Sequence, residues 1–121
     1  MESSKLLIIS TIGQENHEKA TLPFVLATAS QSLDVEVVMF LQSSAVVLAK
    51  KGEAEKVRAE GFAPLGELFD TFMDMGGKLY LCSPCIKERD IAPGDLVDGV
   101  QSGAAGTLVH EVMSADSVVT Y

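Results

Sequence analysis

The sequence predicts an α/β fold in which parallel β-strands alternate with helices that lie on both faces of the sheet. Short apolar, β-branched runs typical of buried strands recur along the chain, and segments with helical apolar spacing separate them. With 121 residues, 47% of them hydrophobic, the chain is long enough to bury a substantial core. We therefore expect one globular domain over residues 1–121, without repeats or linkers.

The first half of the chain begins with a predicted strand over Leu6–Ile12, a continuous Ile-rich run. A helix face of about two turns follows, with apolar residues spaced i, i+3, i+4 and i+7: Leu22, Val25, Leu26 and Ala29. Two starts are open for this helix: either Thr21 caps its regular part, or an earlier helical turn is kinked at Pro23. A β-branched strand over Val35–Leu41 and a short apolar helix over Ala45–Ala49 come next.

The middle of the chain contains its best helix pattern. The preceding segment, Lys50–Glu60, mixes charges of both signs and is predicted to be a solvated helix or loop. Five residues then repeat at helical spacing, a stripe more typical of a core than of a ligand groove: Leu65, Leu68, Phe69, Phe72 and Met73. Gly76 and Gly77 end this helix, and a third strand is predicted over Lys78–Cys82.

The last third continues the alternation of helices and strands. Ser83–Arg89 is expected to form one or two helical turns, because Pro84 suits the first turn of a helix. A fourth short strand is predicted within Asp95–Gln101, centred on Val97–Val100, and the final strand over Ser117–Tyr121. Between these two strands lies a helix face: Ala105, Leu108, Val109 and Val112.

Composition excludes several classes of partner. Nine basic and 17 acidic residues give a net charge of −8, which disfavours binding to nucleic acid and to anionic membranes. Seven aromatic residues without tryptophan are too few to predict a base-stacking surface.

The apolar run Leu6–Ile9 is too short for a secretory signal, and no run approaches membrane-spanning length. We expect a cytoplasmic protein.

Two cysteines carry the main chemical signal. Cys82 and Cys85 lie too close in sequence for a disulfide between them to stabilise a fold of this size. Cys82 ends a predicted parallel strand, and ligand sites of open α/β sheets lie at that edge. The following helix and the charge of Arg89 favour a thiolate there, whereas Glu88 and Asp90 oppose it. A lowered pKa for Cys82 is therefore a hypothesis to be tested.

Several other interpretations apply to the same residues. Each cysteine can simply be a small buried hydrophobic residue. The C-x-P-C spacing is similar to that of a thioredoxin dithiol, but in thioredoxin the motif follows the first strand of a different βαβ arrangement and a cis-proline comes later. Neither feature accompanies the motif here. Zinc would need two further ligands, which His17 and His110 do not supply as a cluster.

His17 follows the first strand and can orient or protonate a bound sulfur species, or it is a solvated loop histidine. Glycine spacing matches no nucleotide-binding motif, so we expect no metal and no cofactor.

Six segments, taken in their order along the chain, carry a resemblance to a known family: Leu6–Ile9, Ala20–Ala29, Glu36–Leu41, Gly77–Cys82 with Arg89 seven residues further on, Asp95–Val100 and Ala115–Tyr121. Nearly the whole chain resembles the DsrE/DsrF-like sulfur-relay proteins. The resemblance implies a three-layer α/β/α domain with a mostly parallel five-stranded sheet that assembles into homotrimers or homohexamers. It also implies that Cys82 carries sulfur as a persulfide. The sequence departs from the family pattern in having Arg89-Asp90 where Arg-Gly is frequent, and in its additional Cys85.

The sequence is compatible with three functions. The first is a sulfur-relay protein that accepts sulfur on Cys82 from a donor protein and passes it to an acceptor, with Arg89 and His17 in support. The second is a dithiol redox protein or persulfide reductase in which Cys85 attacks the persulfide on Cys82. The third is a non-catalytic, oligomeric interaction protein whose cysteines only pack.

Overall fold

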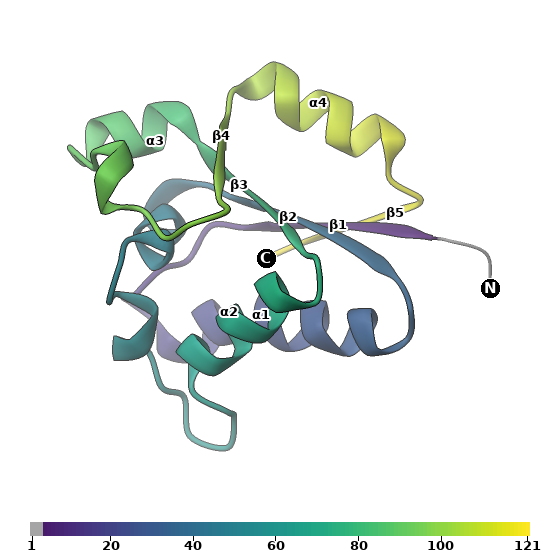
Figure 1. Ribbon diagram of the computed structural model, residues 1–121, viewed down its shortest axis with the longest axis horizontal. Helices are drawn as coiled ribbons and strands as arrows, with labels where there is room; N and C mark the ends of the chain where they lie inside the picture. Colours follow the sequence, from purple (N-terminus) through teal and green to yellow (C-terminus); the bar gives the residue numbers. More distant parts are fainter. Residues whose placement is uncertain (1–3) are drawn as a thin grey trace.

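The computed structural model describes residues 4–121 and shows a five-stranded, all-parallel sheet with helices (Figure 1). The strands are β1 (Lys5–Ser10), β2 (Glu36–Leu41), β3 (Lys78–Cys82), β4 (Gln101–Gly103) and β5 (Ser117–Thr120), in the order β4-β3-β2-β1-β5. The α-helices are α1 (His17–Ser32), α2 (Leu65–Asp74), α3 (Ser83–Glu88) and α4 (Ala105–Ser114). Three 3-10 helices complete the chain: η1 (Ser43–Ala49), η2 (Ala54–Lys56) and η3 (Pro93–Asp95). The predicted α/β class with a parallel sheet is confirmed.

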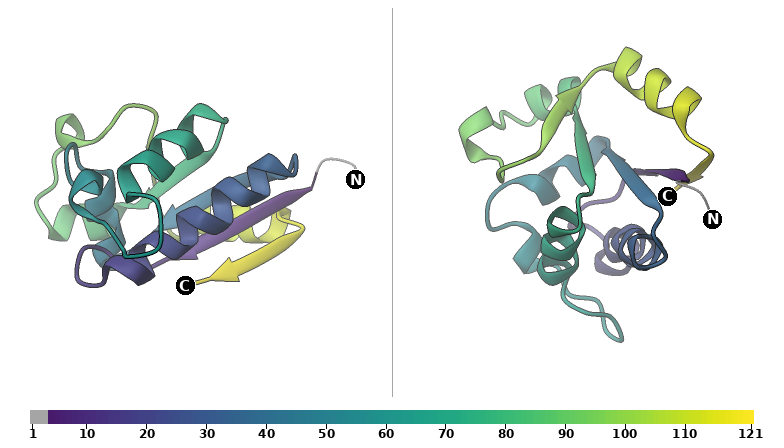
Figure 2. Two further views of the ribbon diagram at one scale, coloured as in Figure 1. Left: turned by 90° about the horizontal axis from the view of Figure 1, so that it is seen from below. Right: turned by 45° about the vertical axis from the view of Figure 1, so that its right-hand side comes forward.

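The order of the strands places the helices in layers on both sides of the sheet. From β1 to β4 the chain moves across the sheet in one direction, and α4 then takes it back to β5 on the far side of β1. Because connections between parallel strands are right-handed, this reversal puts α4 on the face opposite α1 and α2. Figures 1 and 2 show α1 and α2 side by side on one face and α4 across the other.

The core fills both faces of the three central strands, whose side chains alternate between the two. On the face covered by α1 and α2, the buried side chains include Ile8, Met39, Leu79, Leu81, Phe24, Phe69 and Phe72. On the other face Leu7, Val38 and Phe40 are buried, with Leu108 of α4 packed against them. Burying each such side chain is worth about 1.5–3 kcal/mol, so the strand ends that carry the site are firmly positioned.

The predicted buried face of α1 is wrong. The helix buries Phe24, Ala27 and Gln31, whereas Val25 is only half-buried and Ala29 is exposed. Apolar residues surround this helix, so their spacing alone could not identify the inner face. Of the two predicted starts the second is closer, because helical turns precede Pro23; the cap is Asn16, whose Oδ1 accepts the Lys19 N–H at 3.0 Å.

Two predictions in the last third also need correction. The fourth strand is Gln101–Gly103, not Val97–Val100, because Gly99 adopts a left-handed turn (φ 90°) and Leu96 pairs instead with Lys50 in an isolated antiparallel bridge. The predicted inner face of α4 is only partly buried. Leu108 packs on the sheet, but Val109 is 60% exposed.

Candidate functional site

Both cysteines lie at the carboxyl edge of the sheet, at the junction of β3 and α3. Cys82 is the last residue of β3 and also the N-cap residue of α3, so the strand passes into the helix without a loop. Pro84 occupies the first turn of α3, where its missing N–H costs no hydrogen bond. Cys85 follows in the same turn. Both thiols are free and half-buried.

A neighbouring strand end fixes Cys85. β2 pairs in parallel with β3, so the segment after β2 begins beside the thiols. There the backbone N–H of Ser43 donates to Cys85 Sγ at 3.2 Å. Ser43 adopts φ 54°, an uncommon conformation for a residue other than glycine. Ser43, the first residue of η1, therefore combines an uncommon backbone conformation with the hydrogen bond that connects η1 to Cys85 of α3.

The surroundings of Cys82 disfavour an activated thiol. Burial raises the pKa of the Cys82 thiol above its ordinary value, and a hydrogen bond with the Cys85 side chain raises it further. The backbone N–H of Cys85 and the charge of Arg89 act in the opposite direction but do not prevail. The sequence identified the favourable groups correctly; it could not show how deeply the sulfur is buried.

Arg89 lies where the sequence suggested, next to the turn that bears the thiols. It is the C-cap residue of α3, and its Nη1 donates to the carbonyl oxygen of Cys85 at 3.2 Å. Its positive charge contributes to the lowered pKa of Glu15 and partly offsets the rise in the pKa of Cys82. The positive charge of Arg89 therefore acts both on the Cys82 thiol and on Glu15 in the loop after β1.

His17 lies apart from this group. It is the first residue of α1, and its Nδ1 contacts the backbone O and N of Arg58, each at 3.3 Å. Within residues 4–121, no hydrogen bond links its ring to either cysteine. A role for His17 in orienting sulfur remains a prediction that these contacts do not support.

Sequence reasoning missed a polar cluster on the same edge, made by Gly13, Glu15 and Ser44. The Ser44 hydroxyl donates to Glu15 Oε2, and the Gly13 N–H contacts both Glu15 Oε1 and Ser44 Oγ at 3.1 Å. A Cβ on Gly13 would lie 2.3 Å from the Ser44 carbonyl oxygen, so only glycine fits there. In the sequence, only Gly13 after the first predicted strand could have indicated this cluster. The cluster joins the loop after β1 to the loop after β2.

The described part of the chain contains neither a cluster of metal ligands nor a membrane-spanning helix. Residues 4–121 contain no group of three or more His, Cys, Asp or Glu side chains arranged to hold a metal ion. Among the same residues, no helix combines the length and apolar character that spanning a membrane requires.

Comparisons with known proteins identify relatives of this chain. The model of the DsrE/DsrF-like family matches residues 4–121. The uncharacterized protein MJ0760 of Methanocaldococcus jannaschii is 31% identical over 106 residues, which are 88% of this chain and only 38% of that relative. A second uncharacterized protein of that organism, MJ0989, is 27% identical over 97% of this chain and 99% of its own length. The crystal structure of YchN from Escherichia coli has a TM-score of 0.83 at 23% identity, covering 98% of this chain and 99% of that one.

The raised pKa of Cys82 predicts slow alkylation at neutral pH. In a Cys85→Ser variant, we expect the rate of reaction with iodoacetamide to reach half its maximum at a higher pH than for a free cysteine peptide. Cys85→Ala removes the raising effects of the Cys85 side chain and leaves burial, so it should bring that midpoint closer to the free value. Arg89→Gln, which removes an opposing charge, should move it further up. A midpoint at or below that of the free peptide would contradict the burial argument.

The hydrogen bonds to Glu15 predict a pH-dependent contribution to stability. The Ser44 hydroxyl is the largest cause that lowers the pKa of Glu15, so the folded state holds the proton less tightly than the unfolded state. Stability from this group is present above the ordinary pKa of about 4.3 and is lost as the pH falls through the lower folded value. Denaturant unfolding should show Glu15→Gln less stable than wild type at pH 7, with the difference shrinking below pH ~4.

Glu60→Gln is the matched control for that measurement, since Glu60 is exposed and has no hydrogen-bond partner within residues 4–121. An unchanged difference between wild type and Glu15→Gln down to pH ~3 would show that the carboxylate charge is not responsible.

Proposed function

Because the chain belongs to the DsrE/DsrF-like family, we propose that it is a sulfur-relay protein that accepts sulfur as a persulfide on Cys82 and passes it on. The observation that carries the proposal is the position of Cys82. It is half-buried at the carboxyl end of β3, and a second thiol and a cation lie next to it. A protein whose working groups are free thiols suits a reducing cytoplasm, and we place it there.

The proposed transfer needs no oxidant. The Cys82 thiol first loses its proton, and the thiolate then attacks the outer sulfur of a donor protein's persulfide. The donor's sulfur–sulfur bond breaks, and the donor leaves as a thiolate. Later an acceptor thiolate attacks the outer sulfur on Cys82, which releases the Cys82 thiolate. Each step exchanges one sulfur–sulfur bond for another, so neither metal nor nucleotide is required.

The raised pKa of Cys82 affects the two steps differently. Less thiolate is present at neutral pH, which slows the loading of sulfur. A thiolate of higher pKa is also a poorer leaving group, so the loaded persulfide loses its outer sulfur more slowly to stray thiols. These properties suit a carrier that holds sulfur until a protein acceptor docks.

The Cys85 side chain lies close enough to Cys82 to raise the pKa of its thiol, and this proximity favours a second candidate, a persulfide reductase. Here the Cys85 thiolate attacks the inner sulfur of the Cys82 persulfide, forms the Cys82–Cys85 disulfide and releases hydrosulfide. An external thiol must then reduce the disulfide. The two candidates share their first step and differ only in what Cys85 does next.

Intact mass after incubation with inorganic polysulfide separates the candidates. We expect wild type and Cys85→Ser to gain one sulfur atom and Cys82→Ser to gain none. A wild-type protein that instead loses two hydrogens, while Cys85→Ser gains sulfur, would identify the reductase. An equal gain in Cys82→Ser would contradict the assignment to Cys82. No change in any variant would leave a non-catalytic interaction protein.

We also propose that the chain associates with copies of itself, as homotrimers or homohexamers, through α4 and β5. The support is a set of exposed apolar side chains on α4, on β5 and at the residue after β5: Val109, Val112, Met113, Val118 and Tyr121. Met113 is 79% exposed, and β5 is an edge strand of the sheet. A second copy of the chain would cover both features.

Light scattering with size-exclusion chromatography tests the assembly. The double substitution Val109→Glu/Met113→Glu should convert the oligomer to a monomer, because it buries two carboxylates in the proposed interface. Leu33→Glu, at an exposed apolar residue that ends α1, is the matched control and should leave the mass unchanged. A monomeric wild type, or an oligomer that survives the double substitution, would contradict the proposal.

A further inference from the structure

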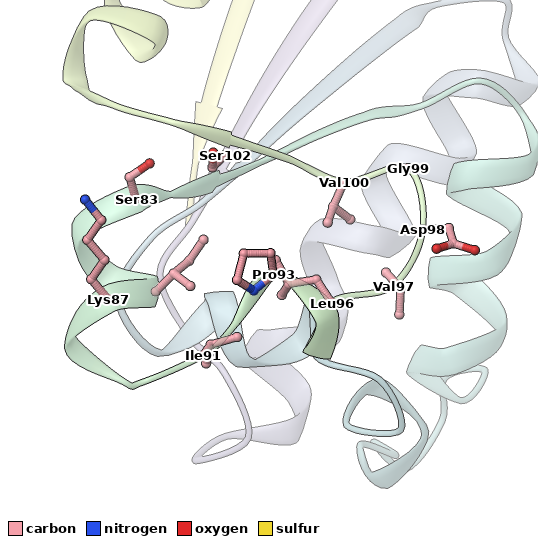
Figure 3. Close-up of a pocket in the computed structure, with 11 residues that line it drawn as sticks. Ser83, Lys87, Ile91, Pro93, Leu96, Val97, Asp98, Gly99, Val100 and Ser102 are labelled. Atoms are coloured by element: carbon pink, nitrogen blue, oxygen red, sulfur yellow. The ribbon is translucent and has the colours of Figure 1, made fainter.

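A cavity of about 480 Å³ lies between α3 and the segment that follows it, residues 91–102 (Figure 3). Its volume falls within the range of small-molecule sites in proteins. Neither cysteine lines it. The turn at Gly99 bends this segment around the cavity, where the sequence pattern predicts a strand.

The floor of the cavity is aliphatic. Ile86 of α3 and Ile91 are each only 8% exposed, and Leu96, Val97 and Val100 are half-buried around them. These side chains supply surface for the apolar body of a ligand. Removing that surface from water favours binding by about 25 cal/mol per Å² before the costs of association.

The polar groups of the cavity are divided between its two ends. Ser83, Lys87 and Ser102 lie together at one end, whereas Asp98 lies at the other (Figure 3). Lys87 forms no salt bridge within residues 4–121, and neither serine hydroxyl has a side-chain hydrogen bond in that range. One end thus offers three unused donors, with a positive charge among them.

We propose that this cavity binds a small amphipathic molecule with an aliphatic chain and one carboxylate. The chain would lie over Ile86 and Ile91, and the carboxylate would accept hydrogen bonds from Lys87, Ser83 and Ser102. The net charge of −8 disfavours multiply charged anions, so a single carboxylate is the head group that fits.

This site is separate from the proposed sulfur site, although both use α3. Ser83, Ile86 and Lys87 are spaced i, i+3 and i+4 and share one side of the helix. The adjacent side of the helix carries Cys82, Cys85 and Arg89. The ligand proposal does not depend on whether Cys82 carries sulfur, and its test can fail without affecting the persulfide result.

Amide chemical shifts of the full chain, titrated with sodium octanoate below its micelle concentration, test the proposal. We expect shifts concentrated in residues 83–102. Lys87→Gln should raise the dissociation constant about fivefold, the effect of losing a partly exposed charge pair. Val100→Phe should abolish binding by filling the cavity. Lys78→Gln, which removes an exposed lysine elsewhere, should leave the constant unchanged.

Octanol and octylamine provide the comparison of head groups. Both should bind more weakly than octanoate, and octylamine most weakly, because Lys87 repels its ammonium group. Equal binding of octanol would overturn the role of the carboxylate. Shifts confined to the apolar surface of α4 and β5, or no shifts at all, would overturn the site. Since Lys87 is exposed, Lys87→Gln keeps the test valid even if Val100→Phe fails to fold.

Discussion

β2 and β3 pair in parallel from Val38 and Lys78 to Leu41 and Leu81, so both strands end at the same edge of the sheet. The geometry of the candidate site depends on this alignment. It brings the Ser43 N–H to the Cys85 sulfur, and it lets β3 enter α3 directly at Cys82. The pairing is stable because apolar side chains cover both faces of the central strands. A slip by one residue would turn Leu79 and Leu81 out of their core and move the thiols with them.

The environment of Cys82 shows how burial and charge compete over a few ångströms. A helix start, a backbone N–H and Arg89 all favour the thiolate, and these groups belong to the thiol's own helix. Desolvation and the second thiol outweigh the backbone N–H and Arg89, so the pKa of Cys82 is raised. Because a raised pKa leaves less thiolate at neutral pH, we expect Cys82 to exchange sulfur slowly in solution. Its proposed reaction therefore depends on a docked partner, which changes solvation at the sulfur when it covers the edge of the sheet.

Much of the fold was predictable from the sequence, because strand-length apolar runs and Pro84 are local signals; β3 was predicted over its observed range, Lys78–Cys82. The errors have a common physical cause. The buried face of α1, the turn at Gly99 and the hydrogen bonds of Glu15 are decided by contacts between distant segments, which local spacing does not encode. The same holds for the site. The position of Cys82 was predictable from strand order, but the sign of its pKa shift follows from packing.

α3 has only six residues, yet it separates two different surfaces. One side carries the thiols and meets η1, and the other forms a wall of the aliphatic cavity. A helix this short has little stability of its own, so packing on both sides must hold it. Ile86 supplies part of that packing, as it is buried in the main core and also lines the cavity. A molecule bound in the cavity would therefore stabilise the helical turn that presents Cys85, which links the two proposed sites through one buried side chain.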